Sequence, residues 1–184
     1  GSLSVADHVI DTLDTRFQGV QALATAKIGD RVFVIAGGGD EGLTVMTLTP
    51  EGRLLTVGQI LQQPGLALDN ITAMTAQVTG GKIDLFVTGE GTGITRLQID
   101  PGSLSPIQIG GGAATLLGTT SADMILGGEG AEVLQGDAGA DILADGGGCD
   151  TLFGGAGADL FVLSADGSHD VIADFQLGTD RIDL

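Results

Sequence analysis

The chain has 184 residues, of which 42% are hydrophobic and 33 are Gly, while Trp and Tyr are absent. This composition supports a folded interior made of small aliphatic side chains, with frequent turns. The formal net charge of −17 argues against nucleic acid as a partner, because nucleic acid is bound by Lys and Arg. The sequence has no run of about 20 apolar residues, so we expect no insertion into a membrane.

The N-terminal half contains two similar segments about 51 residues apart, ATAKIGDRVFVIAGGG at 24–39 and AQVTGGKIDLFVTGEG at 76–91. Each copy alternates short β-rich runs with glycine-containing turns, which is typical of antiparallel meanders. We expect strands at 32–36, 43–48 and 54–57 in the first copy, and at 83–88, 94–99 and 104–109 in the second.

The segments FVIAGGGDEGLTV and LFVTGEGTGIT resemble β-propeller blades, and this resemblance covers roughly residues 17–110. A propeller ring needs about four to eight blades. The two copies therefore leave open whether they are a slice of a longer array or two meanders packed face to face. Glycines at 37, 39 and 42 match a dinucleotide-binding pattern, but the LTVMTLT that follows is strand-like, so we expect no nucleotide site.

A second period, of nine residues, begins at Gly118 and reads GTTSADMIL, GGEGAEVLQ, GDAGADILA, DGGGCDTLF and GGAGADLFV. The pattern is G-G-x-G-x-D-x-U-x, a known calcium-binding β-helix signature, in which U is a large apolar residue. Aspartates hold the sixth place at Asp123, Asp141, Asp150 and Asp159. The eighth place holds Ile125, Leu134, Leu143, Leu152 and Phe161.

Six residues that turn tightly, followed by three that form a strand, predict a coil of two nonapeptides with turns on alternating sides. Turns 18 residues apart then lie next to each other and present carbonyls and carboxylates to a shared gap. Ca²⁺ prefers six to eight such oxygens, whereas Zn²⁺ prefers His or Cys. The acids support this: 13 of the 24 Asp and Glu lie from Gly118 onward, against one basic residue, Arg181.

The repeat block resembles the RTX repeats of bacterial proteins exported by type I secretion. The tail DVIADFQLGTDRIDL at 170–184 resembles the segment that closes the β-roll in that family, which includes serralysin-type proteases. The resemblance covers about residues 110–184. It implies several bound calcium ions, each held by carbonyls of places one and three in one turn, carbonyls of places two and four in the turn 18 residues later, and the aspartates of both turns.

Carried over by position, this arrangement gives three sets of ligands. Gly118, Thr120 and Asp123 face Asp137, Gly139 and Asp141; Gly136, Ala138 and Asp141 face Gly155, Gly157 and Asp159; on the opposite edge, Gly127 and Glu129 face Gly146, Gly148 and Asp150. The same turn adds Asp145, which replaces the first Gly, and Gly147, while Asp166 and Asp170 are expected to complete a last site. Glu132 and Ala114 depart from the sixth-place Asp, and we interpret 109–117 as a start cap without a full site.

The sequence thus predicts an all-β chain, with antiparallel blade-like repeats at 3–110 and a parallel β-roll with its C-terminal cap at 111–184. His8 and His169 share no metal-ligand spacing and adjoin no nucleophile motif, so we expect no catalytic site. Three hypotheses remain: a calcium-binding module of a secreted Gram-negative protein, extracellular or at the cell surface; an adhesion segment; or a non-catalytic accessory domain of a larger secreted enzyme such as a protease. Self-association or an extracellular partner would use the N-terminal half.

Overall fold

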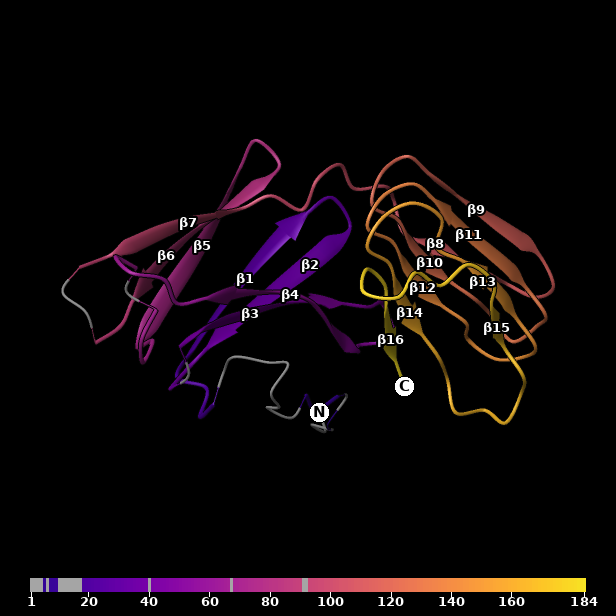
Figure 1. Ribbon diagram of the computed structural model, residues 1–184, viewed down its shortest axis with the longest axis horizontal. Coiled ribbons are helices and arrows are strands. Elements are labelled where there is room, and N and C mark those ends of the chain that lie inside the picture. The colour runs from indigo at the N-terminus through magenta and orange to yellow at the C-terminus, as the bar shows by residue number, and fades with distance from the viewer. Residues whose placement is uncertain (1–4, 6, 10–17, 40, 67, 91–92) are drawn as a thin grey trace, which may run out of the picture. The chain divides into compact units, whose positions relative to one another are not determined.

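A computed structural model of the chain describes residues 5, 7–9, 18–39, 41–66, 68–90 and 93–184 (Figure 1). Within these ranges the chain forms strands β1 to β16 and no helix, and so no helix able to cross a membrane. The chain divides into two compact units, residues 1–100 and 101–184. The predicted all-β class is confirmed, with antiparallel sheets in the N-terminal part and a parallel β-solenoid in the C-terminal part.

The first unit contains two antiparallel meanders. The first has the order β1 (Ala22–Ile28), β2 (Arg31–Gly37), β3 (Gly42–Leu48) and β4 (Leu54–Leu61), and the second has the order β5 (Ala73–Thr79), β6 (Lys82–Thr88) and β7 (Thr95–Ile99). The two sheets contact each other through their edge strands β1 and β5. The runs expected at 32–36, 43–48, 54–57 and 83–88 are strands, and the run expected at 94–99 begins one residue later, at Thr95.

Strand β1 shows why these runs form half-buried sheets. Ala22, Ala24 and Ala26 are buried while the residues between them are exposed, which is the two-residue period of a strand with one face on the core. In β6 the fully buried Ile83 and Leu85 fill the interior of the second meander. Aliphatic residues, together with Phe33 and Met46, thus form the core of a unit that has no Trp or Tyr.

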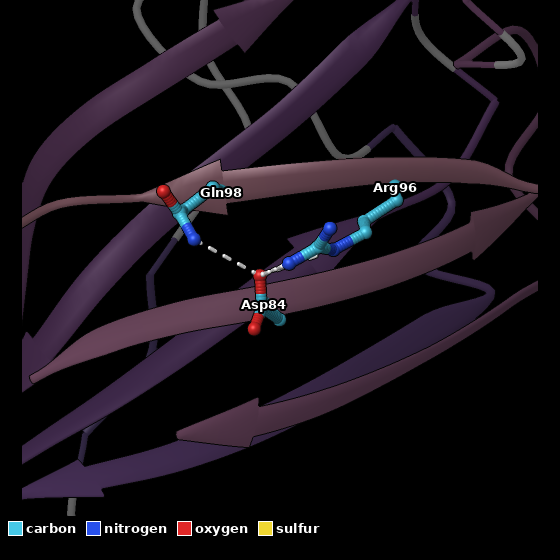
Figure 2. A network of polar contacts seen from close by, with 3 residues as sticks. All are labelled: Asp84, Arg96 and Gln98. Atoms are coloured by element: carbon cyan, nitrogen blue, oxygen red, sulfur yellow. Dashed lines mark hydrogen bonds and ion pairs between the residues drawn. The ribbon is translucent and has the colours of Figure 1, made fainter. Parts of the chain in front are cut away.

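A polar cluster on the second meander is shown in Figure 2. Asp84 of β6 is buried, and its Oδ1 accepts hydrogen bonds from Arg96 Nη2 at 2.6 Å, from Arg96 Nε at 3.2 Å and from Gln98 Nε2 at 3.2 Å, both partners lying on β7. The Arg96 guanidinium holds the pKa of Asp84 below its usual value of 3.8. Arg96 and Gln98 both lie on the neighbouring strand β7, so their bonds to Asp84 help to fix the β6–β7 register.

The strand expected at 104–109, as the third of the second copy, is wrong. Only Gln108–Ile109 (β8) is a strand, and it pairs in parallel with β10 of the second unit. Pro101 precedes this stretch and Pro106 lies within it, and proline has no N–H to donate to an antiparallel ladder. The units therefore separate after Asp100, and the boundary expected at residue 110 falls inside the first coil of the roll.

The second unit is a roll of two parallel sheets (Figure 1). One sheet has the order β8, β10 (Met124–Leu126), β12 (Ile142–Ala144), β14 (Leu160–Val162) and β16 (Arg181–Asp183), and the other has the order β9 (Thr115–Thr119), β11 (Val133–Asp137), β13 (Thr151–Phe153) and β15 (Val171–Ile172). Ile125 pairs with Leu143, and Leu143 with Phe161. These 18-residue steps confirm that two nonapeptides make one coil.

The core of the roll consists of the eighth-place side chains. Ile125, Leu134, Leu143, Leu152 and Phe161 form one fully buried cluster between the two sheets, as the nine-residue period predicts. The last coil departs from this period, because Leu152 pairs with Ile172 and Phe161 with Ile182, 20 and 21 residues later. The added residues lie in the connecting turns, where Phe175 places its ring 6.1 Å from that of Phe161.

Candidate metal centre

The turns of the roll form two stacks. Edge 1 consists of turns 118–123, 136–141 and 154–159 and the longer segment 173–180, and edge 2 consists of turns 110–114, 127–132, 145–150 and 163–170. Each turn enters the following strand through its sixth-place residue, or through Asp170 and Asp180 in the last coil. Parallel strand pairing on both sides of every turn holds these residues one above another.

On edge 1 the sixth-place aspartates form a hydrogen-bonded ladder. Oδ1 of Asp141 accepts the main-chain N–H of Asp123 at 2.8 Å, and Oδ1 of Asp159 accepts that of Asp141 at 3.0 Å. Oδ1 of Asp180 extends the ladder by accepting the N–H of Asp159 at 3.1 Å. Each carboxylate thus reaches back toward the turn one coil earlier and lies in the gap between the two turns.

Edge 2 repeats this ladder with a Glu at its start. Oδ1 of Asp150 accepts the N–H of Glu132 at 2.7 Å, and Oδ1 of Asp170 accepts the N–H of Asp150 at 3.0 Å. Glu132 occupies the sixth place as the Asp residues do, and its Oε2 accepts the N–H of Gly128 within its own turn. Asp170 holds an equivalent position although it lies 20 residues after Asp150, because the extra residues are accommodated in turn 163–170.

The ladder carboxylates are buried but incompletely hydrogen-bonded. Asp123, Glu132, Asp150 and Asp159 are each no more than 2% exposed. One oxygen of each lacks a hydrogen-bond donor among the residues that the structure describes: Oδ1 of Asp123, Oε1 of Glu132, and Oδ2 of Asp150 and Asp159. A buried charged oxygen without a partner is costly, so these atoms indicate a cation that belongs in the stack.

The electrostatics of the stack also favour a bound cation. Burial raises the pKa of Asp145, Asp150 and Asp159 above the usual value of 3.8, and neighbouring carboxylates contribute to each rise. For Asp150 these neighbours are Glu132, Asp170 and Asp145, and for Asp159 they are Asp180 and Asp174. Like charges crowd both edges, and a divalent cation would relieve their repulsion.

Main-chain carbonyls line the same gaps, and their direction alternates along each turn. A Cβ placed on Gly118 would lie 2.2 Å from the first-place carbonyl oxygen of Gly136, which therefore points to the preceding turn. A Cβ on Gly155 would lie 2.0 Å from the second-place carbonyl oxygen of Asp137, which therefore points to the following turn. The third-place carbonyl of Ala156 points back and accepts the N–H of Gly139 at 2.9 Å.

This direction differs from the pairing expected from the resemblance. Places two and four of the earlier turn face places one and three of the later turn, whereas the expected sets had these roles exchanged. Successive peptides of an extended turn point alternately up and down, and the spacing of residues in the sequence does not specify which set points up. The same turns still face each other, but the carbonyls that point into each gap belong to residues one place away from those expected.

On edge 1 the structure brings together both predicted pairs of turns. Turn 118–123, with Gly118, Thr120 and Asp123, contacts turn 136–141 through the bond from Ala138 N–H to the carbonyl of Thr119 at 3.2 Å. Turn 136–141, with Gly136, Ala138 and Asp141, contacts turn 154–159, with Gly155, Gly157 and Asp159, through the bond from Ala156 N–H to the carbonyl of Asp137 at 2.8 Å. Whether these residues ligate an ion stays a prediction.

On edge 2, turn 127–132 meets turn 145–150 through the bond from Gly147 N–H to the carbonyl of Gly128 at 2.6 Å. Asp145 is buried and accepts the N–H of Ser164 with both carboxylate oxygens, at 3.0 and 2.9 Å. Asp166 is exposed and accepts the N–H of Gly148 at 2.9 Å. The hydrogen bonds from Ser168 and Gly148 lower the pKa of Asp166 to about 2.

Two residues of the stack were missed by the sequence analysis. Asp180 is buried at the sixth-place position before β16, and Asp174 accepts the N–H groups of Gly154 and Gly155 at 2.9 Å each. The signal for Asp180 is present in the sequence, because Asp180-Arg181-Ile182 repeats the D-x-U part of the nonapeptide. It was hidden by the inserted residues, which break the nine-residue count.

Oxygen atoms are the only ligands these gaps offer in quantity, namely Asp and Glu carboxylates and main-chain carbonyls. Within the described ranges no three His, Cys, Asp or Glu side chains converge as a metal-binding group, so an ion would need carbonyls for much of its coordination. Ca²⁺ accepts such mixed oxygen shells of six to eight ligands in flexible geometry. The donor set and the unpartnered buried oxygens therefore fit Ca²⁺ better than Zn²⁺.

Comparison with protein families gives a match over the same part of the chain. The family model described as RTX calcium-binding nonapeptide repeat (4 copies) matches residues 109–143, 126–161 and 135–172. These overlapping matches span β9 to β15, the repeats that form the parallel roll. A comparison with curated proteins gives no significant match.

Proposed function

We propose, from the premise that residues 109–172 are RTX calcium-binding nonapeptide repeats, that this chain is a calcium-dependent folding module of a secreted bacterial protein. The observation that carries the proposal is the pair of buried carboxylate ladders with unpartnered oxygens. Calcium supplies positive charge and a flexible oxygen shell when bound. The module is non-catalytic in this proposal.

The chain's own residues would hold the ions in gaps between turns. In the first gap of edge 1, between turns 118–123 and 136–141, the carboxylates of Asp123 and Asp141 would be joined by carbonyls of both turns. In the second gap, between turns 136–141 and 154–159, Asp141 and Asp159 would act in the same way. On edge 2 the corresponding groups are Glu132 and Asp150, followed by Asp145, Asp150 and Asp170.

Folding of the roll would be coupled to the ions for an electrostatic reason. The coil places 13 acidic residues and one basic residue from Gly118 onward, and six of the acids are buried at sixth places. Without a cation the stacked carboxylates repel one another, so the unfolded chain is favoured. Extracellular calcium modules work in the range of about 0.1–1 mM, well above free calcium in the cytosol.

A module that folds only in this calcium range would fold after export, because free calcium in the cytosol is too low. The chain would stay unfolded during synthesis and fold outside the cell, at the surface or in the medium. RTX repeats in residues 109–172 favour secretion from a Gram-negative cell by a type I system. The N-terminal meanders would then serve as a surface for self-association or for an extracellular partner.

The test is circular dichroism of the full chain in calcium-free buffer, titrated with CaCl2 and, as a matched control, with MgCl2. We expect calcium to induce a cooperative gain of β signal at sub-millimolar to millimolar concentration. Mg²⁺ should give little change, because it demands a tight octahedral shell and keeps its water. A β signal from the roll that is unaffected by chelation would contradict the proposal.

A further inference from the structure

The third gap of edge 1 lies between turn 154–159 and the segment 173–180, and it has the features of a calcium gap. Sixth-place aspartates flank it, Asp159 before β14 and Asp180 before β16, and both are buried. The second-place carbonyl of Gly155 points into it, as the equivalent carbonyl of Asp137 points into the second gap. By position alone this gap would be expected to hold an ion.

Protein groups fill the gap instead. Nε2 of Gln176 donates to the carbonyl of Gly155 at 2.6 Å, and the carboxylate of Asp174 accepts the N–H groups of Gly154 and Gly155 at 2.9 Å each. The main-chain N–H of Gln176 donates to Oδ2 of Asp180 at 2.7 Å. One of the three residues inserted in the last coil lies in the segment 173–180, which forms this network.

The carboxylates show how the gaps differ. In the second gap, Asp159 uses Oδ1 to accept the N–H of Asp141, while its buried Oδ2 has no hydrogen-bond donor among the described residues. In the third gap, Asp180 uses Oδ1 to accept the N–H of Asp159 and Oδ2 to accept the N–H of Gln176, at 3.1 and 2.7 Å. The anionic oxygens of Asp180 are satisfied by main-chain donors, so no cation is needed to stabilise them.

We infer that the third gap of edge 1 takes no calcium, and that the side-chain amide of Gln176 occupies the position on the Gly155 carbonyl that a cation would otherwise approach. This inference rests on the proposed function, because it distinguishes one gap from those that bind ions. Gln176 is thus a residue that sets the number of ions, and the last coil closes the roll through hydrogen bonds of its own.

The test counts bound calcium ions on the full chain by native mass spectrometry at saturating calcium, with folding of each variant checked by circular dichroism. Asp159→Asn should bind one ion fewer than the wild-type chain, because it removes a carboxylate from the second gap. Asp180→Asn makes the same chemical change one coil later and should bind the same number as wild type. Loss of one ion from Asp180→Asn would overturn the inference.

A second variant guards against misfolding of Asp180→Asn. Gln176→Glu keeps the size of the side chain but replaces the amide nitrogen with a carboxylate oxygen beside the Gly155 carbonyl. The third gap would then offer only oxygen ligands, and we expect one more bound ion than in wild type. An unchanged count would overturn the role of the amide, whereas a wild-type chain that binds no calcium would overturn the proposed function and this inference together.

Discussion

Oδ1 of Asp141 accepts the main-chain N–H of Asp123 at 2.8 Å, across 18 residues of chain. The carbonyl of Asp123 in turn accepts the N–H of Ile142 at 3.0 Å. Both main-chain groups of Asp123, its N–H and its carbonyl, therefore bond to the next coil. This arrangement separates two roles of the sixth-place carboxylate. One oxygen maintains the stack, and the charge of the group remains available for a cation.

Asp141→Asn tests this separation of roles. Asn retains an oxygen for the N–H of Asp123 but loses the negative charge, so we expect a folded roll that binds at least one calcium ion fewer, because Asp141 belongs to the first and the second gap. At calcium 100-fold above the dissociation constant, the lost stabilisation is about 2.7 kcal/mol for each ion lost. Calorimetric titration and thermal melts in calcium measure both effects. Asp30→Asn, an exposed turn residue of the first unit, is the charge-matched control and should change neither.

The stability of the metal-free roll should rise on mild acidification. Burial raises the pKa of Asp145, Asp150 and Asp159 above 3.8, so the folded roll binds more protons than the unfolded chain between that value and the folded pKa values. Linkage then makes stability increase as the pH falls from 7 toward about 4. With calcium present the sign reverses, because protons compete for the carboxylates. The measurements are the β signal of the roll at pH 7 and 5 in metal-depleted buffer, and melting curves at the same pH values in calcium. Changes in the same direction in both would contradict this.

Asp137 provides a test of carbonyl against carboxylate ligation. It has a φ of 75°, a left-handed conformation that glycine adopts without strain, and its side chain is exposed. Asp137→Gly should therefore keep the ion count and be at least as stable as wild type. Asp137→Ala should keep the ion count but cost about 1 kcal/mol in calcium-loaded melts. An ion lost from Asp137→Gly would show that the carboxylate, and not the carbonyl, is the ligand.

Gly127→Ala should prevent the coils of edge 2 from stacking. A Cβ at this position would lie 1.8 Å from the carbonyl oxygen of Asp145, a main-chain atom that cannot move without disturbing the next turn. We expect a loss of about 3 kcal/mol in denaturant titrations with calcium. Gly111→Ala is the control, because a Cβ there meets no atom within 4 Å, and its effect should stay within about 0.5 kcal/mol.

Arg96→Met should destabilise the first unit alone. It removes two hydrogen bonds from the buried Asp84 and lets the pKa of that carboxyl rise. Because the folded pKa of Asp84 is depressed, its contribution is present above pH 3.8 and is lost as the pH falls through the folded value, so the variant should unfold at a higher pH during acid titration. Lys82→Met breaks an exposed ion pair with Asp100 on the same meander and should have little effect. A change in calcium affinity would contradict the assignment of Asp84 to the first unit alone.

The repeat block was the most predictable part of the structure. A nine-residue period places Leu134 and Leu152 on the same face by counting, and both lie in the core. Counting in steps of nine fails in the last coil, because two or three inserted residues shift Ile172 and Ile182 out of the period. In the structure these residues still pair with Leu152 and Phe161 as eighth-place residues do. The direction of the carbonyls was also inaccessible, since it depends on how one coil rises to the next.

The N-terminal half was predicted less completely for a different reason. Strands such as β2 and β3 stand out as dense apolar runs, whereas β1 and β5 carry Ala and Thr, whose signal is weak. Residues 104–109 looked like a strand in composition, but Pro101 before them and Pro106 within them keep the segment out of the antiparallel sheet, and its end pairs with β10 instead. The strand propensity of each segment therefore located most strands, but it did not show which strands pair with each other.

Asp141 and Asp159 of edge 1 each belong to two contacts, because the carboxylate reaches back one coil while the main-chain N–H is held by the carboxylate one coil ahead. An ion bound in one gap therefore also orders a main-chain group that lines the next gap. A one-dimensional array with such nearest-neighbour coupling responds to its ligand over a narrow concentration interval. The roll would then behave as a threshold element that is either assembled or not, rather than as a graded calcium buffer.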